Sequence, residues 1–183
     1  MTLEARLVAV LLAATVGAAP TVLRLDVPVI RQAPERCGPA ALEMVMRYYG
    51  AGPAALAEAG RAYDPTLRGS LITDLAECAR RAGFAADVVT LTPDSLASWL
   101  ARGVPPILLI HSGLGPIAVG HYAVLVGWDP VRRRYALHDG GPSTREVGAA
   151  SLTRRWRGGG FQALLVHQAP GLAGGGAQRS GPP

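Results

Sequence analysis

The chain has 183 residues, of which 18 are basic and 13 acidic, so its formal net charge is +5, and 49% of its residues are apolar. A chain of this size and apolar content can bury a core without disulfides or metals, which excludes wholesale disorder and predicts one main domain. Two cysteines are too few for the disulfide framework of a small secreted domain.

All of the basic residues are arginines. Together with the abundant alanine and glycine, this indicates a bias in nucleotide composition rather than a selected role. The arginines are spread along the chain without interleaved aromatic residues, which make up only 5% of it, so nucleic acid is not expected as a partner.

Residues 1–19 have the pattern of a secretory signal peptide. A short start bearing Arg6 precedes an apolar run from Leu7 to Val16, and small residues then allow cleavage after Ala18. The run is shorter than the roughly 20 residues that span a bilayer, so no stable membrane span is expected after cleavage. The sequence thus predicts an exported protein, periplasmic or extracellular, with an uncleaved anchor or a misassigned start site as the alternatives.

The folded domain is expected over residues 20–168, followed by a disordered tail at 169–183 that is poor in residues able to form a core. Three segments have the apolar spacing and end signals of helices: 38–49, 70–82 and 92–102. Five segments are typical of strands: 85–90, 106–110, 121–127, 134–138 and 161–166. Helices that come before most of the strands favour an α+β fold over a doubly wound sheet.

Cys37 directly precedes Gly38 and Pro39, at the expected start of a helix. Unpaired N–H groups and the helix dipole stabilise an anion there, which favours a reactive thiolate. Gln32 lies five residues upstream, and its amide can donate a hydrogen bond to the oxyanion that forms when a thiolate adds to a carbonyl. The alternative is a small buried cysteine and a surface glutamine, and this segment alone does not choose between the two.

The second cysteine, Cys78, falls on the apolar side of an expected helix with Leu75, which predicts a buried and inert thiol. A Cys37–Cys78 disulfide is the alternative in an oxidising compartment. No Cys-x-x-Cys, His-x-x-x-His or His-Glu-x-x-His spacing is present, so neither a zinc site nor another cofactor is expected.

A cysteine nucleophile needs a base, and His121 is the best placed of the four histidines. It stands at the start of an expected strand beside Gly120, where a side chain can face a cleft. His111 is interpreted as a loop residue, His167 as a solvated strand end, and His138 as pointing away from its neighbour Asp139.

Asp139 ends the strand that pairs with the one carrying His121. A hairpin with its tip at Asp129-Pro130 brings His121 and Asp139 to the same end of the sheet. The Asp139 carboxylate can there accept from the imidazole and stabilise its charged form. A turn-forming aspartate without this role is the alternative.

These residues, in this order and spacing, resemble a known family, the double-glycine leader peptidases of cysteine-peptidase family 39. The quoted pattern runs over residues 27–167 and contains these segments: Val27-Pro28, Gln32, Cys37-Gly38-Pro39-Ala40-Ala41, Tyr49-Gly50, Gly69-Ser70, Asp74-Leu75, Gly103-Val104-Pro105, Gly120-His121-Tyr122, Gly127-Trp128-Asp129, Asp139 and Trp156. The family commonly has proline after its aspartate, where this chain has Gly140.

The resemblance implies a papain-like fold, with N-terminal helices packed on a mostly antiparallel sheet. It also implies a cysteine peptidase with Cys37 as nucleophile, His121 as base, Asp139 as orienting acid and Gln32 as oxyanion donor, acting on a peptide or protein. Many relatives process leader peptides after Gly-Gly, and free-standing exported members are common. A peptide-binding module without turnover and a thiol acyltransferase or amidase are the alternatives.

Overall fold

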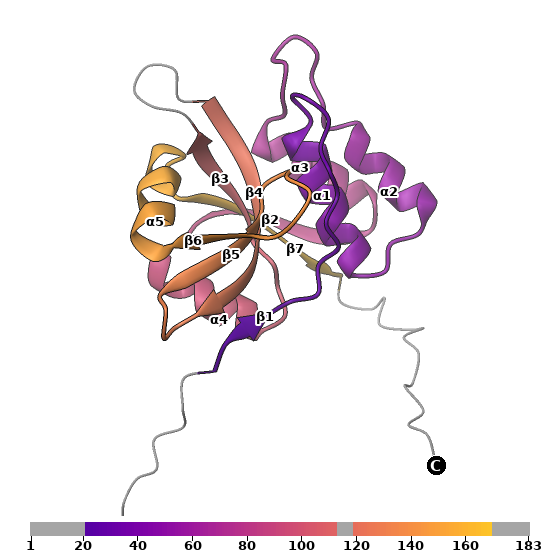
Figure 1. Ribbon diagram of the computed structural model, residues 1–183. Coiled ribbons are helices and arrows are strands. Elements are labelled where there is room, and N and C mark those ends of the chain that lie inside the picture. Colours follow the sequence, from indigo (N-terminus) through magenta and orange to yellow (C-terminus); the bar gives the residue numbers. More distant parts are fainter. Residues whose placement is uncertain (1–20, 113–118, 170–183) are drawn as a thin grey trace, which may run out of the picture.

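The computed structural model describes residues 21–112 and 119–169, so the expected signal peptide and most of the expected tail lie outside the described residues (Figure 1). Its helices are α1 (Cys37–Tyr48), α2 (Pro53–Gly60), α3 (Ile72–Arg81), the 3₁₀ turn η1 (Pro93–Ser95), α4 (Leu96–Ala101) and α5 (Ala149–Gly158). Its strands are β1 (Leu23–Arg24), β2 (Phe84–Thr90), β3 (Ile107–Ser112), β4 (Val119–Asp129), β5 (Arg134–His138), β6 (Arg145–Gly148) and β7 (Gln162–Gln168).

The strands form one antiparallel sheet in the order β2-β7-β3-β4-β5-β6, and β1 pairs with β4. Helices precede most of the strands, and the last strand returns to lie between β2 and β3. The predicted α+β class, with helices on a mostly antiparallel sheet, is confirmed.

Helices cover both faces of the sheet, with α1, α2 and α3 on one face and α4 and α5 on the other (Figure 1). Side chains alternate between the faces along a strand, and β4 shows this clearly. Tyr122, Val124 and Val126 belong to the core under α1 and α3, while Ala123 and Leu125 belong to the core under α4 and α5. The central apolar part of β4 is therefore buried on both sides.

Most of the expected elements are present, with three notable differences. His111 belongs to β3 and lies opposite Gly120 of β4, so its interpretation as a loop residue was wrong. The expected helix at 92–102 is divided into η1 and α4. Two helices, α2 and α5, were not predicted, since α2 buries only Ala59, and α5 buries only Leu152 and Trp156 among several arginines.

Trp156 explains why α5 forms in spite of its polar sequence. Its side chain is fully buried, its ring meets Phe161 edge-on, and its Nε1 donates a 2.8 Å hydrogen bond to the carbonyl of Gln162. Burial of one large aromatic side chain thus holds the helix on the sheet. Among the described residues, no helix is both long enough and apolar enough to cross a membrane.

Candidate active site

Cys37 is the first residue of α1, at the helix start that the sequence predicted, and its side chain is half-buried. Gly38 follows it, and a Cβ atom at Gly38 would lie 2.9 Å from both Cβ and Oγ of Ser70. Glycine therefore lets the loop before α3 approach the start of α1. The Tyr122 hydroxyl donates a 3.1 Å hydrogen bond to the carbonyl of Ser70, which ties the same loop to β4.

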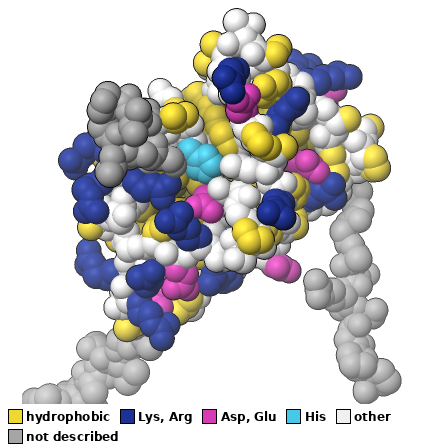
Figure 2. Space-filling model, turned by 45° about the horizontal axis from the view of Figure 1, so that its top comes forward, with side chains coloured by type: hydrophobic (Ala, Val, Ile, Leu, Met, Phe, Trp, Pro, Cys, Tyr) yellow, Lys and Arg dark blue, Asp and Glu magenta, His cyan; other side chains and the backbone are white. Residues whose placement is uncertain are grey.

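A cavity of about 640 Å³ opens beside the Cys37 thiol, and Gln32 and His121 also line it. Its rim carries three exposed apolar side chains, Leu67, Leu71 and Val119, whose exposed fractions are 54%, 52% and 68%. Figure 2 shows a histidine side chain at the surface, close to hydrophobic side chains. The nucleophile and base expected from the sequence thus face one solvent-accessible cavity, which is called the Cys37 cavity below.

The Cys37 thiol and the His121 ring line the same cavity and shift each other's pKa. Burial raises the pKa of the thiol, but His121 and main-chain hydrogen bonds from Tyr122 and Gly38 outweigh burial, so this pKa lies below its usual value. Burial lowers the pKa of the imidazole, but Cys37, the Asp139 carbonyl and the charge of the Asp139 carboxylate together outweigh burial, so the pKa of His121 is raised. Both shifts favour a thiolate–imidazolium pair.

His121 meets Asp139 through the main chain rather than through the carboxylate. The His121 Nε2 atom lies 3.0 Å from the carbonyl oxygen of Asp139. A carbonyl can only accept, so Nε2 carries a proton and Nδ1 is the ring nitrogen left free of this bond. The Asp139 carboxylate instead accepts a 3.1 Å hydrogen bond from Nη1 of Arg145. The sequence predicted that Asp139 lies beside His121, but it predicted contact through the carboxylate, whereas the structure shows contact through the main-chain carbonyl.

Gln32 packs against Gly140, the residue that follows Asp139. Gly140 has a φ of +87°, and a Cβ atom there would overlap the Gln32 side chain at Cγ, Cδ and Oε1. Glycine is therefore required both for the backbone conformation and for the space that Gln32 fills. The glycine that departs from the family pattern thus sets the position of the expected oxyanion donor.

Hydrogen bonds of Glu35 join the segment before Cys37 to the wall of the cavity, and the sequence did not predict them. Glu35 accepts from Arg68 Nε at 2.8 Å and from the Tyr63 hydroxyl at 3.2 Å. Glu35 and Arg68 have φ values of +63° and +52°, and both line the Cys37 cavity. No pattern in the sequence signals a pair 33 residues apart, because the loops that carry it are brought together by α1 and α3.

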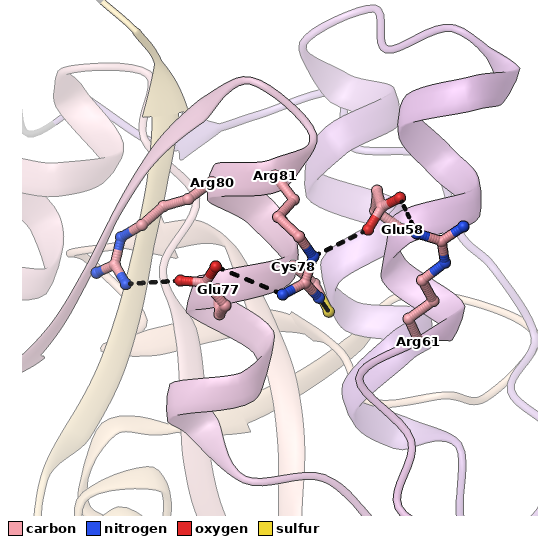
Figure 3. Close-up of polar contacts among 6 residues, drawn as sticks. All are labelled: Glu58, Arg61, Glu77, Cys78, Arg80 and Arg81. Atoms are coloured by element: carbon pink, nitrogen blue, oxygen red, sulfur yellow. Dashed lines mark hydrogen bonds and ion pairs between the residues drawn. The ribbon is translucent and has the colours of Figure 1, made fainter.

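Cys78 has a different environment, since its thiol is 1% exposed in α3 and both cysteines are free. Arg81 Nη2 lies 2.9 Å from the Cys78 sulfur, and Figure 3 shows this arginine between Glu77 and Glu58. Burial raises the pKa of the Cys78 thiol, and the charge of Arg81 only partly offsets it. The predicted buried thiol is confirmed, and the disulfide alternative is absent from the structure.

The other histidines lie outside the Cys37 cavity. His138 is buried with Nε2 3.0 Å from Thr144 Oγ1, and His167 Nε2 lies 3.7 Å from Asp87 Oδ2. Within residues 21–112 and 119–169, no three His, Cys, Asp or Glu side chains gather in a way that could hold a metal ion.

Solved structures with this fold include several peptidase domains. The peptidase domain of Streptococcus ComA, a bifunctional ABC transporter of a quorum-sensing pathway, is 18% identical with a TM-score of 0.63, and the match covers 78% of this chain and 99% of that one. A double-glycine-motif protease of an AMS/PCAT transporter, solved with its leader peptide, is 24% identical with a TM-score of 0.61 and coverages of 80% and 94%. These similarities show the papain-like peptidase fold.

A C39-like protein from Bacillus anthracis has a TM-score of 0.67 at 17% identity, and the match covers 82% of this chain and 99% of that one. None of the curated proteins matches the chain. The model of the Peptidase_C39 like family matches residues 24–164, which include Gln32, Cys37, His121 and Asp139. Because this match spans most of the chain, the protein belongs to the Peptidase_C39 like family.

Proposed function

We propose that the protein is a cysteine peptidase that uses Cys37 as its nucleophile. The observation that carries the proposal is that Cys37, at the start of α1, and His121 line one open cavity, with the thiol pKa lowered and the imidazole pKa raised. Family membership supports the same activity. Cys78, by contrast, has Arg81 rather than an imidazole beside its sulfur, and burial raises the pKa of its thiol.

In the proposed reaction the Cys37 thiolate attacks the carbonyl carbon of a peptide bond, and the resulting oxyanion accepts a hydrogen bond from the Gln32 amide. The His121 imidazolium gives its proton to the leaving amine, and the C–N bond breaks to leave a thioester. A water molecule, deprotonated by His121, then attacks the thioester carbonyl carbon. The C–S bond breaks, which releases the carboxylic acid product and restores the Cys37 thiolate beside the protonated His121. The Asp139 carbonyl accepts from Nε2 of His121, which leaves Nδ1 for the proton transfers.

Export and substrate class complete the proposal. The signal-peptide pattern of residues 1–19 supports an exported enzyme. The leader peptide bound to the AMS/PCAT protease supports a peptide substrate for this chain as well. Processing of leader peptides is the finer proposal, since both transporter peptidase domains share the fold.

The proposal is tested by incubating the purified protein with a diverse peptide mixture and identifying the products by mass spectrometry. We expect new peptides whose masses correspond to addition of water across one peptide bond. Bound but intact peptides would instead identify a binding module. Products whose masses show transfer to an amine or thiol would identify an acyltransferase, and either result would contradict a peptidase.

Substitution of Gly140 by alanine is expected to lower kcat/KM by about 10²-fold, the usual effect of losing an oxyanion donor. The added Cβ would displace Gln32 and would strain a residue at positive φ. Gly141→Ala is the matched control, since a Cβ there meets no atom closer than 3.7 Å. The role of Gln32 would be contradicted if Gly140→Ala and Gly141→Ala kept equal activity in peptide hydrolysis.

Asp139→Asn is expected to lower kcat by only about three- to tenfold. The main-chain carbonyl that holds His121 remains, whereas loss of a carboxylate bonded directly to the imidazole costs about 10⁴-fold in the serine-protease triad. Asp129→Asn, at the far end of the same hairpin, is the control for loss of a turn carboxylate. A loss near 10⁴-fold in steady-state kinetics would show that the carboxylate reaches His121 during turnover.

A further inference from the structure

The arginines of this protein are mostly paired, which makes the exceptions informative. Within residues 21–112 and 119–169, nine arginines have a carboxylate within 4.0 Å, and they are Arg24, Arg47, Arg61, Arg68, Arg80, Arg81, Arg132, Arg134 and Arg145. Arg36 and Arg102 lie over aromatic rings, and Arg155 donates to the carbonyl of His111. In the described part of the chain, this leaves four arginines with neither an acidic nor an aromatic partner: Arg31, Arg133, Arg154 and Arg157.

Three of these four, Arg133, Arg154 and Arg157, line the same hollow of about 560 Å³. It lies between the turn after β4, η1 and α5, and is called the arginine hollow here. Arg133 comes from the turn, where its φ is +53°, and the other two come from α5. Figure 2 shows basic side chains gathered on the side of the molecule that carries α5.

The positive charge of the three arginines is not neutralised by acidic residues that line the arginine hollow. Asp94 is the one acidic residue among the described residues that line it, and no carboxylate oxygen of Asp94 comes within 4.0 Å of the three guanidinium groups. Apart from Thr153, the remaining wall is apolar or aromatic, and the rings of Trp128 and Tyr135 lie against each other, tilted by 32°, with centroids 4.3 Å apart. Three guanidinium groups without a carboxylate partner therefore line an open hollow beside a largely apolar wall.

We propose that the arginine hollow binds an acidic peptide segment. Guanidinium groups match carboxylates with two parallel hydrogen bonds, and several arginines at fixed spacing favour a chain of carboxylates over a single ion. The aromatic and proline wall gives such a segment apolar contact. That the acidic segment belongs to a substrate rests on the peptidase function proposed above; its binding to the hollow does not.

The arginine hollow is distinct from the Cys37 cavity, with which it shares no residue. His121 and Trp128 lie seven residues apart on β4, so the two sites are separated by about 23 Å at 3.3 Å per strand residue. A peptide that reached both would need at least about seven extended residues between its acidic segment and the scissile bond. The hollow would thus select substrates by a feature remote from the cleaved bond.

The test measures binding of fluorescently labelled hexaglutamate by anisotropy, at low ionic strength, to the Cys37→Ala protein. This variant keeps the arginine hollow and cannot cleave the probe, so the result does not depend on peptidase activity. We expect saturable binding that weakens as salt is added, because the contacts are between charges near the surface. The triple variant Arg133→Gln, Arg154→Gln and Arg157→Gln should bind at least about tenfold more weakly.

A control variant removes the same charge elsewhere, by changing Arg24, Arg47 and Arg61 to glutamine, and should bind within about twofold of the parent. Equal losses in the two triple variants would show attraction by net charge alone and would overturn the proposal. The proposal would also be overturned if hexaglutamate did not bind. Tighter binding of a thymidine hexanucleotide than of hexaglutamate, lost in the Arg133, Arg154 and Arg157 variant, would overturn it as well. Thermal unfolding of both triple variants shows that a loss of binding does not come from loss of the fold.

Discussion

Replacing Cys37 by alanine is expected to abolish peptide cleavage, with a loss of at least about 10⁴-fold, because removal of a nucleophile eliminates the covalent route altogether. The same change should end labelling by a thiol-directed peptide warhead. Only the sulfur atom of a half-buried residue is lost, so the midpoint of thermal unfolding should change little. Cleavage is measured by mass spectrometry and labelling by the mass of the intact protein.

Cys78→Ala is the matched control, because it removes the only other thiol. Cys78 is 1% exposed and its pKa is raised by burial, so it should neither react with the warhead nor be needed for cleavage. Labelling that persists in the Cys37 variant, or that maps to Cys78, would contradict the assignment of the nucleophile.

His121→Ala is expected to lower the cleavage rate by about 10³-fold or more and to shift the alkylation of Cys37 to higher pH. In the native protein His121 is the largest of the influences that lower the pKa of Cys37, so iodoacetamide should react quickly even at neutral pH. Without the imidazole, only the main-chain hydrogen bonds from Tyr122 and Gly38 oppose burial, so the pKa of the thiol should rise. Alkylation should then be slow at pH 7 and recover only as the pH rises above about 8.5, the ordinary pKa of cysteine.

The measurement is the rate of alkylation as a function of pH, with His167→Ala as the control. His167 is a partly exposed histidine whose nearest acidic partner is Asp87, outside the Cys37 cavity. The His167→Ala variant should show the same dependence of the alkylation rate on pH as the native protein. An unchanged profile in His121→Ala would show that the thiolate is stabilised by the start of α1 and the main-chain N–H groups rather than by the imidazole.

Asp139 shows how far sequence reasoning reached within the site. The turn signal at Asp129-Pro130 and the strands on either side of it predicted that His121 and Asp139 meet at one end of the sheet, and the pairing of β4 with β5 confirms the hairpin. Which atom of Asp139 faces the imidazole depends on Arg145, six residues later on β6, which takes the carboxylate. The spacing of apolar residues predicts which strands pair. It does not predict whether the Asp139 carboxylate bonds to His121 or to Arg145.

The arginines likewise show what the sequence predicts and what depends on the fold. Counting charges along the sequence gave a basic chain without a basic stripe and no indication of a partner. The fold places most arginines beside carboxylates and leaves three of the described exceptions around one hollow. Because pairing joins residues from different elements, such as Arg81 with Glu58 or Arg24 with Glu146, its exceptions emerge only after folding.

The sequence alone determined the α+β class, a helix start at Cys37-Gly38, the hairpin that brings His121 near Asp139 and the burial of Cys78, because periodic apolar residues and end signals act over a few neighbouring positions. Only the tertiary structure decided that α5 forms around Trp156, that Gly140 makes room for Gln32 and that the Asp139 carbonyl holds the imidazole. Each of these depends on contacts between segments distant in the chain, whose free energy comes from burial and hydrogen-bond geometry that local spacing does not encode.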